Sequence, residues 1–141
     1  MRILNSAHLA LLVVALAACD DEEEDCLNRV CPPETGSPPG LTLEVRVSPP
    51  PSGGRVRVEV YSGSEVESGT MITSWESSSG DPSRTLGVSE GDYSGHAMYT
   101  RPGDTLDAYD SDDANIRETT DDCDCHTGWF ADDGTLDLRE N

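Results

Sequence analysis

Lysine is missing from this sequence: all nine basic residues are arginines, and they face 28 aspartates and glutamates. The formal net charge is −19. A surface of this sign repels the phosphates of nucleic acids and of anionic lipid headgroups, so we exclude nucleic acid as a partner. The acids are spread along the chain. This favours adaptation to high salt over selection for a divalent-cation site, because such a site needs clustered ligands.

Aromatic side chains and helical periodicity are also scarce. The chain has one phenylalanine, two tryptophans and four tyrosines, so its core must be small and built mainly from valine, leucine and alanine. From residue 41 onward, no ten-residue stretch spaces its apolar residues as a helix would. We therefore expect a single small domain without helices, and such domains usually need extra stabilisation.

The apolar run near the N-terminus is too short to cross a membrane. Residues 9–18 are ten residues without a charge. As a helix they would span ~15 Å, against ~30 Å for the hydrocarbon core of a bilayer. Arg2 is the only basic residue before this run. A short apolar run behind a basic residue is typical of a cleavable export signal.

The run ends in Leu16-Ala17-Ala18-Cys19. This order of residues resembles the lipobox of bacterial lipoproteins. The resemblance implies that residues 1–18 are removed and that Cys19 becomes a lipid-bearing N-terminus. It also implies a lipid-anchored location on the extracytoplasmic side of the cell membrane or the outer membrane. The alternative is an ordinary export signal cleaved at Ala-x-Ala, with Cys19 incidental.

After this cysteine, residues 19–40 are predicted to form a disordered tether. Residues 20–25 are six consecutive acids, which repel one another and stay extended. Residues 32–40 are rich in proline and glycine, which disfavour helix and central strand. We therefore expect a signal peptide over 1–18, a lipidated tether, and a folded domain over 41–141. Without the signal peptide the chain has eight arginines and 28 acids, a net charge of −20.

The domain is predicted to consist of short strands separated by turns. In the first two strands, apolar and polar residues alternate with a period of two. The predicted strands are 41–47, 55–60, 70–76, 83–89, 92–100, 104–110, 127–130 and 135–139. Pro102-Gly103 predicts a type II turn, and Ala131-Asp132-Asp133-Gly134 predicts a hairpin between the last two strands. The pattern indicates an all-β fold, an antiparallel β-sandwich of seven or eight short strands.

Two segments of the domain carry a family resemblance. VRVEVYSG (56–63) and EGDYSGHAMYTRPGD (90–104) resemble the immunoglobulin-like and prealbumin-like modules of bacterial surface proteins. In such modules a Gly-Asp-Tyr step opens a late strand and a Pro-Gly turn closes it. The resemblance implies an immunoglobulin-like sandwich. In it, Tyr93 is either a plain core residue or the donor of a tyrosine-corner hydrogen bond.

No catalytic residue is predicted. Residues 87–91 match Gly-x-Ser-x-Gly, but a nucleophile elbow needs a helix after the serine and a parallel sheet beneath it. His96 is expected to face solvent from a strand whose other face is apolar. The acids at 110–115 and 121–124 could offer carboxylate oxygens to calcium, but they do not fit the EF-hand loop, and aspartate is common throughout this sequence.

Four cysteines remain besides Cys19, namely Cys26, Cys31, Cys123 and Cys125. An even number in an exported chain predicts two disulfide bonds. We expect Cys26 and Cys31 to pair with Cys123 and Cys125. The reason is that an extended strand would hold the α-carbons of the last two ~6.5–7 Å apart, at the limit for a direct bond. The alternative is that each pair closes on itself, because a turn at Asp124 could bring Cys123 and Cys125 together with some strain.

These observations predict a membrane-anchored extracytoplasmic lipoprotein. Its domain is expected to be a non-enzymatic structural or binding module of the cell envelope. The expected partners are the membrane, through the N-terminal lipid, and an envelope protein, with no cofactor. The alternative is an extracytoplasmic metal-binding protein. In that case Cys123, Cys125 and His126 would offer two thiolates and an imidazole for zinc or copper(I), and Cys26 and Cys31 could complete the site.

Overall fold

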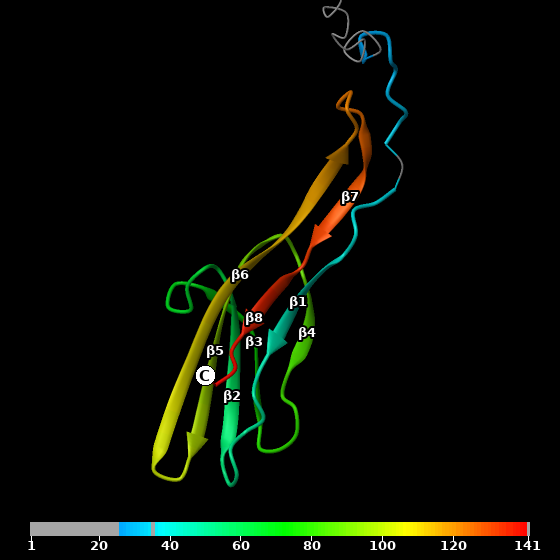
Figure 1. Cartoon of the computed structure of the whole chain (residues 1–141). Coiled ribbons are helices and arrows are strands. Elements are labelled where there is room, and N and C mark those ends of the chain that lie inside the picture. The colour runs from blue at the N-terminus through cyan, green and yellow to red at the C-terminus, as the bar shows by residue number, and fades with distance from the viewer. Residues whose placement is uncertain (1–25, 35, 141) are drawn as a thin grey trace, which may run out of the picture. The chain divides into compact units, whose positions relative to one another are not determined.

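The computed structural model describes residues 26–34 and 36–140, so the export signal and Cys19 lie outside the described residues. The chain divides into two compact units, Met1–Pro32 and Pro33–Asn141. The second unit contains eight strands (Figure 1): β1 (Leu41–Arg46), β2 (Arg55–Ser62), β3 (Thr70–Ser77), β4 (Arg84–Val88), β5 (Gly91–Arg101), β6 (Asp104–Thr120), β7 (His126–Asp132) and β8 (Gly134–Asp137). The described part of 26–40 has no strand.

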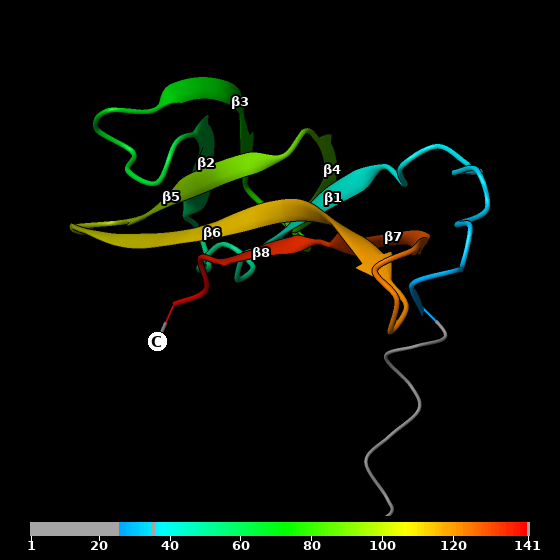
Figure 2. The same ribbon diagram turned by 90° about the horizontal axis from the view of Figure 1, so that it is seen from above.

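The strands form two sheets, and the fold is the predicted all-β sandwich. One sheet has three strands in the order β4-β1-β8, and the other has five in the order β3-β2-β5-β6-β7. Neighbouring strands are antiparallel except β1 and β8, which run parallel. This parallel pair arises because β7 in the large sheet is followed after one residue by β8 in the small sheet (Figure 2).

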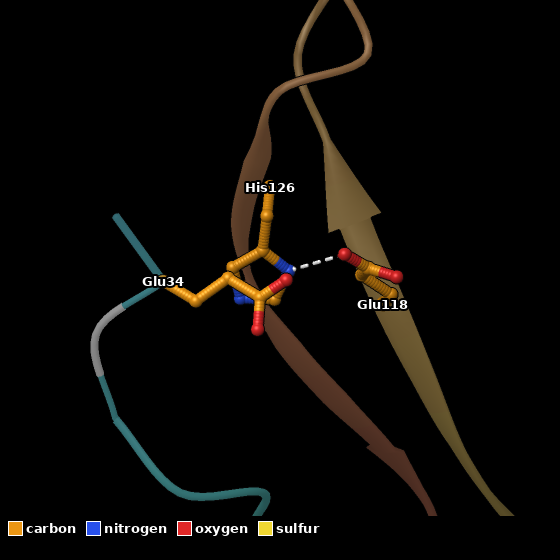
Figure 3. A group of neighbouring side chains, drawn as sticks. All are labelled: Glu34, Glu118 and His126. Atoms are coloured by element: carbon orange, nitrogen blue, oxygen red, sulfur yellow. Dashed lines mark hydrogen bonds and ion pairs between the residues drawn. The ribbon is translucent and has the colours of Figure 1, made fainter. Parts of the chain in front are cut away.

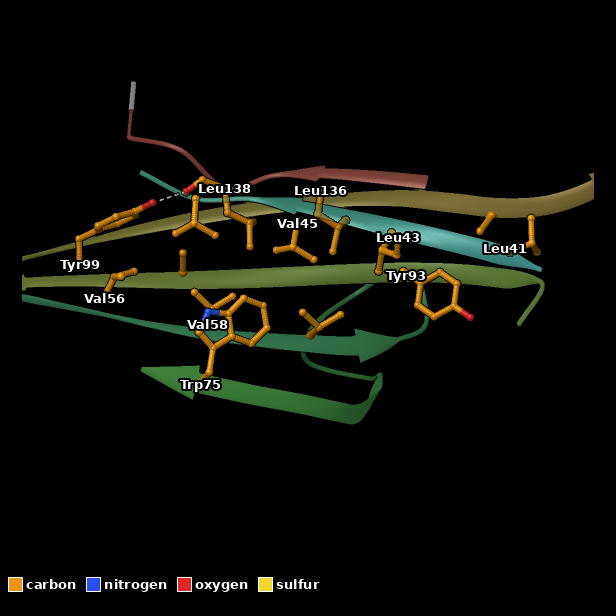
Figure 4. Packing of buried hydrophobic residues seen from close by; sticks show 14 residues of the cluster. Leu41, Leu43, Val45, Val56, Val58, Trp75, Tyr93, Tyr99, Leu136 and Leu138 are labelled. Atoms are coloured by element: carbon orange, nitrogen blue, oxygen red, sulfur yellow. Dashed lines mark hydrogen bonds between the residues drawn. The ribbon is translucent and has the colours of Figure 1, made fainter. Parts of the chain in front are cut away.

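Side-chain alternation along the strands builds the core between the sheets. In β1 the leucines and the valine are buried and the residues between them are exposed, and β2 follows the same period. The buried apolar cluster (Figure 4) comprises Leu41, Leu43, Val45, Val47, Val56, Val58, Val60, Trp75, Tyr93, Ala97, Tyr99, Ala114, Leu136 and Leu138. Valine and leucine therefore fill most of the core, as the composition predicts.

Two tyrosines of β5 are buried in this core, and both donate a hydroxyl hydrogen bond to a backbone carbonyl. Tyr93 donates to Ser89 at 2.6 Å, so the tyrosine-corner alternative is the one the structure adopts. Tyr99 donates to Leu138 at 2.7 Å and accepts from the backbone N–H of Ser48 at 2.9 Å. Burial raises the pKa of Tyr99. These bonds allow the phenols to be buried without leaving the hydroxyl groups unsatisfied.

Aspartates of β6 bind the edge strand β8. The backbone N–H groups of Thr135 and Asp137 donate to the carboxylates of Asp112 and Asp110, each at 2.7 Å. Side chains from the large sheet therefore satisfy β8 donors on the edge that faces away from β1.

Other acids of the same group have separate roles. Successive side chains on a strand point to opposite faces, so Asp113 points away from Asp110 and Asp112 and accepts a hydrogen bond from the Asn115 amide. The acids at 110–115 thus do not converge on one point.

Strand β6 is longer than predicted. Its residues 104–114 pair with β5, and residues 115–120 pair with β7. Residues 111–120 include few apolar side chains, so the period-two signal ended before the strand did. The turn before β6 is as predicted, because Gly103 has a φ of 85°, which a type II turn requires at its third position.

The predicted hairpin at residues 131–134 is wrong. Strand β7 pairs with β6, β8 pairs with β1, and Asp133 is the single residue between β7 and β8. Gly134 serves a close backbone approach instead of a turn. A Cβ atom there would lie 2.9 Å from Cδ1 of Leu43 and 3.0 Å from the carbonyl oxygen of Asp113.

Candidate functional site on the hairpin between β6 and β7

The β6–β7 hairpin places an imidazole and a carboxylate on one face. Its register shifts between Thr119 and Thr120, which leaves one extra residue in β7. The extra residue changes the side-chain alternation, so His126 and Trp129 fall on the same face although they are three positions apart. Their ring centroids are 4.8 Å apart. Glu118, the cross-strand partner of Trp129, belongs to the same face.

One nitrogen of His126 is bonded and the other is not. Nδ1 lies 2.7 Å from Oε1 of Glu118. The His126 side chain is only 8% exposed. Its Nε2 atom is buried and has no hydrogen-bond partner. Leaving a buried polar atom unsatisfied costs about 1–3 kcal/mol, so an orphaned imidazole nitrogen calls for an explanation.

A second carboxylate reaches the same place from the segment before β1. Glu34 is exposed, and its carboxylate lies beside the His126 ring (Figure 3). One potential ligand atom from each of Glu34, Glu118 and His126 lies within 4.8 Å of the others. No other group of this kind is found among residues 26–34 and 36–140. Of these three residues, only His126 was a candidate ligand from the sequence alone, since Glu34 and Glu118 lie far apart in the chain.

Cys123 and Cys125 lie in a tight loop and not in the extended conformation on which the expected cross-pairing is based. One carboxylate oxygen of Asp121 accepts the backbone N–H groups of both cysteines, each at 3.0 Å. Between them, Asp124 has a left-handed φ of 57°. The strand-geometry argument for cross-pairing these cysteines is therefore wrong. The Asp121 carboxylate organises this loop, so the calcium interpretation of 121–124 loses support.

Cys26, Cys31, Cys123 and Cys125 are all disulfide-bonded, which confirms the prediction of two disulfide bonds. A sulfur atom in a disulfide bond is not a thiolate and does not bind a metal as one. The predicted Cys-x-Cys-His metal cluster therefore lacks its two sulfur ligands. Its third member, His126, belongs to the group with the two glutamates.

His96 lies on the outer face of the five-stranded sheet, but it is shielded instead of facing solvent. Its ring stacks on Tyr109 with centroids 4.4 Å apart, and its side chain is 12% exposed. Nε2 is 2.7 Å from Asp107, and Nδ1 is 3.8 Å from Glu59. Tyr61 donates a hydrogen bond to Glu59, which lowers the pKa of Glu59 and raises that of Tyr61. Because both His96 nitrogens have a nearby carboxylate, this network differs from the one at His126.

An open groove of about 330 Å³ lies next to Tyr109. It is lined by Ser64, Glu65, Val66, Glu67, Ser94, Tyr109, Asp110 and Ser111. The loop between β2 and β3 forms one wall. The buried Ser94 hydroxyl has no hydrogen-bond partner. The three acids in the wall disfavour an anionic ligand, and nothing in the groove defines a reaction.

Ser89 does not stand in a nucleophile elbow. It lies in the short connection between β4 and β5, and its carbonyl accepts the hydrogen bond of Tyr93. Strand β5 follows where the elbow requires a helix. The Gly-x-Ser-x-Gly match is therefore a coincidence of sequence.

Comparison of the chain with protein-family models, curated proteins and solved structures gives no match. Among the described residues, no helix is long and apolar enough to span a membrane.

Proposed function

We propose that this chain is a lipid-anchored lipoprotein on the extracytoplasmic side of the cell membrane or the outer membrane. The observation that carries the proposal is Leu16-Ala17-Ala18-Cys19 at the end of a short apolar run. The two disulfide bonds support it, because such bonds persist in oxidising compartments outside the cytoplasm.

We further propose that the β-sandwich is a non-enzymatic binding or structural module of the cell envelope. The Ser89 environment supports this reading, since it lacks the helix that an activated serine needs. The strongly acidic composition restricts the module's partner to a surface that is not itself anionic. An envelope protein fits that requirement better than a lipid headgroup or a nucleic acid.

Detergent phase separation of cells expressing the full chain tests the anchor. The wild-type protein should partition into the detergent phase and incorporate labelled fatty acid. The Cys19→Ser variant should remain unprocessed or partition into the aqueous phase, because it lacks the thiol that accepts the diacylglycerol. Asp20→Asn is the matched control, since it alters the next residue and keeps the thiol. Recovery of wild-type protein in the aqueous phase, without label, would contradict the proposal.

The alternative of metal binding through Cys123 and Cys125 loses support, because both cysteines are disulfide-bonded. The metal-binding alternative would apply again to a reduced form of the protein, in which the cysteines are thiols. A count of free thiols on the purified, unreduced chain tests this directly, and four free thiols would revive the alternative.

A further inference from the structure

We propose that Glu34, Glu118 and His126 form a binding site for a divalent transition-metal ion of the zinc class. The proposal does not depend on the lipid anchor. It starts from the Nε2 atom of His126, which is buried and unpartnered in a side chain that is only 8% exposed.

The hydrogen bond to Glu118 prepares that nitrogen for a metal. When the Glu118 carboxylate accepts the proton on Nδ1 at 2.7 Å, the neutral imidazole leaves a lone pair on Nε2. Metal-ligating histidines almost always donate their other ring N–H to a carboxylate or carbonyl group, which fixes the tautomer and makes the ligand more basic. Trp129, with its ring 4.8 Å away, packs against the imidazole and limits its rotation.

Glu34 supplies an oxygen ligand next to the imidazole (Figure 3). Its carboxylate makes no hydrogen bond or ion pair with the rest of the described chain. In a tetrahedral zinc site with bonds of ~2.1 Å, neighbouring ligand atoms are ~3.4 Å apart. One ligand atom from each of the three residues lies within 4.8 Å of the others, and a rotamer change of Glu34 would bring its carboxylate to bonding distance. This exposed side chain is carried by a segment without helix or strand. Water would complete the coordination.

The donor set selects the metal. An imidazole nitrogen of His126 with a carboxylate oxygen of Glu34 and water suits zinc, copper(II), nickel and cobalt, whereas calcium and magnesium prefer oxygen-only sites. A neutral imidazole and two carboxylates carry a charge of about −2, which compensates a divalent cation locally. The competing interpretation is a hydrogen-bonded group of His126 and the two glutamates that binds no metal.

Calorimetric titration of the purified full-length chain in detergent, first stripped with EDTA, separates these interpretations. We expect one zinc ion per chain. Glu34→Gln should weaken zinc binding at least about tenfold by removing a ligand, and Glu118→Gln should weaken it about 10–100-fold by removing the partner that orients the imidazole. Calcium and magnesium should not compete at equal concentration.

His96→Gln is the matched control, because it removes the other imidazole of the described chain and should leave zinc binding unchanged. The ¹⁵N shifts of the wild-type imidazoles provide a measurement that needs no variant. Zinc should move Nε2 of His126 and leave His96 in place. Absence of zinc binding, unchanged binding in Glu34→Gln, or equal binding of calcium would overturn the proposal and identify either an ion pair or diffuse counterion binding.

Discussion

The Tyr99 hydroxyl donates a hydrogen bond to the Leu138 carbonyl at 2.7 Å and so joins the five-stranded sheet to the end of the chain. The same oxygen accepts the Ser48 N–H. Tyr99→Phe should leave both backbone groups without this partner and lower the free energy of unfolding by about 1–3 kcal/mol. Urea denaturation measures the difference. Tyr109→Phe, at a tyrosine that is 62% exposed, should change stability little. Equal losses in the two variants would contradict this account.

The same tyrosine predicts sensitivity to alkali. Burial raises the pKa of Tyr99 above its ordinary value of about 10. The stability contributed by the neutral phenol is therefore complete below pH ~10 and is lost as the pH rises through the raised pKa of the folded state. Unfolding free energy measured across this range should fall less steeply in Tyr99→Phe. Tyr61→Phe serves for comparison, since the bond to Glu59 also raises the pKa of Tyr61. Parallel curves for wild type and Tyr99→Phe would refute the assignment.

Gly134→Ala should destabilise the sandwich by about 1–3 kcal/mol, as overpacked positions do. The new methyl group would lie 2.9 Å from Cδ1 of Leu43 and 3.0 Å from a backbone oxygen of Asp113. Gly87→Ala is the control, because a Cβ atom there meets nothing within 4 Å. Thermal melts of the two variants should differ clearly, and similar melting temperatures would argue against the close approach.

Salt should stabilise the protein. The net charge of −19 repels itself in the compact state. At 1 M salt the Debye length falls to ~3 Å, which screens much of this repulsion. The melting temperature should therefore rise between low and molar NaCl. An equimolar series in sucrose controls for general solute effects, and a flat or falling melting temperature in NaCl would contradict the prediction.

We expect Cys26 and Cys31 to pair with Cys123 and Cys125. The strand argument for this pairing does not hold, because Asp124 turns the chain between the last two cysteines. The entropic argument remains: a bridge closing a loop of ~90 residues stabilises by ~4.6 kcal/mol in the chain-entropy model, and a local bridge gives less. A peptide map without reductant should link a 26–31 fragment to a 123–125 fragment. Two self-bridged peptides would exclude the pairing.

The sequence predicted most strands because alternation records which side chains face the core. It failed where other forces shape the chain. Residues 111–120 form strand through pairing with β5 and β7 although few of them are apolar. Asp133-Gly134 resembles a turn because Gly134 is selected for lack of a side chain. The group at His126 could not be predicted, because Glu34 joins it through tertiary structure alone.

The carboxylates of Asp110 and Asp112 also affect whether neighbouring molecules can pair through the edge of β8. A sheet edge with unbonded N–H groups is a template for strands of other molecules. Here the N–H groups of Thr135 and Asp137 are already occupied by those carboxylates. A second chain that added itself to this edge would have to displace two charged acceptors and bring further negative charge against them. Neighbouring copies of the chain at high concentration would thus be kept from polymerising through β8.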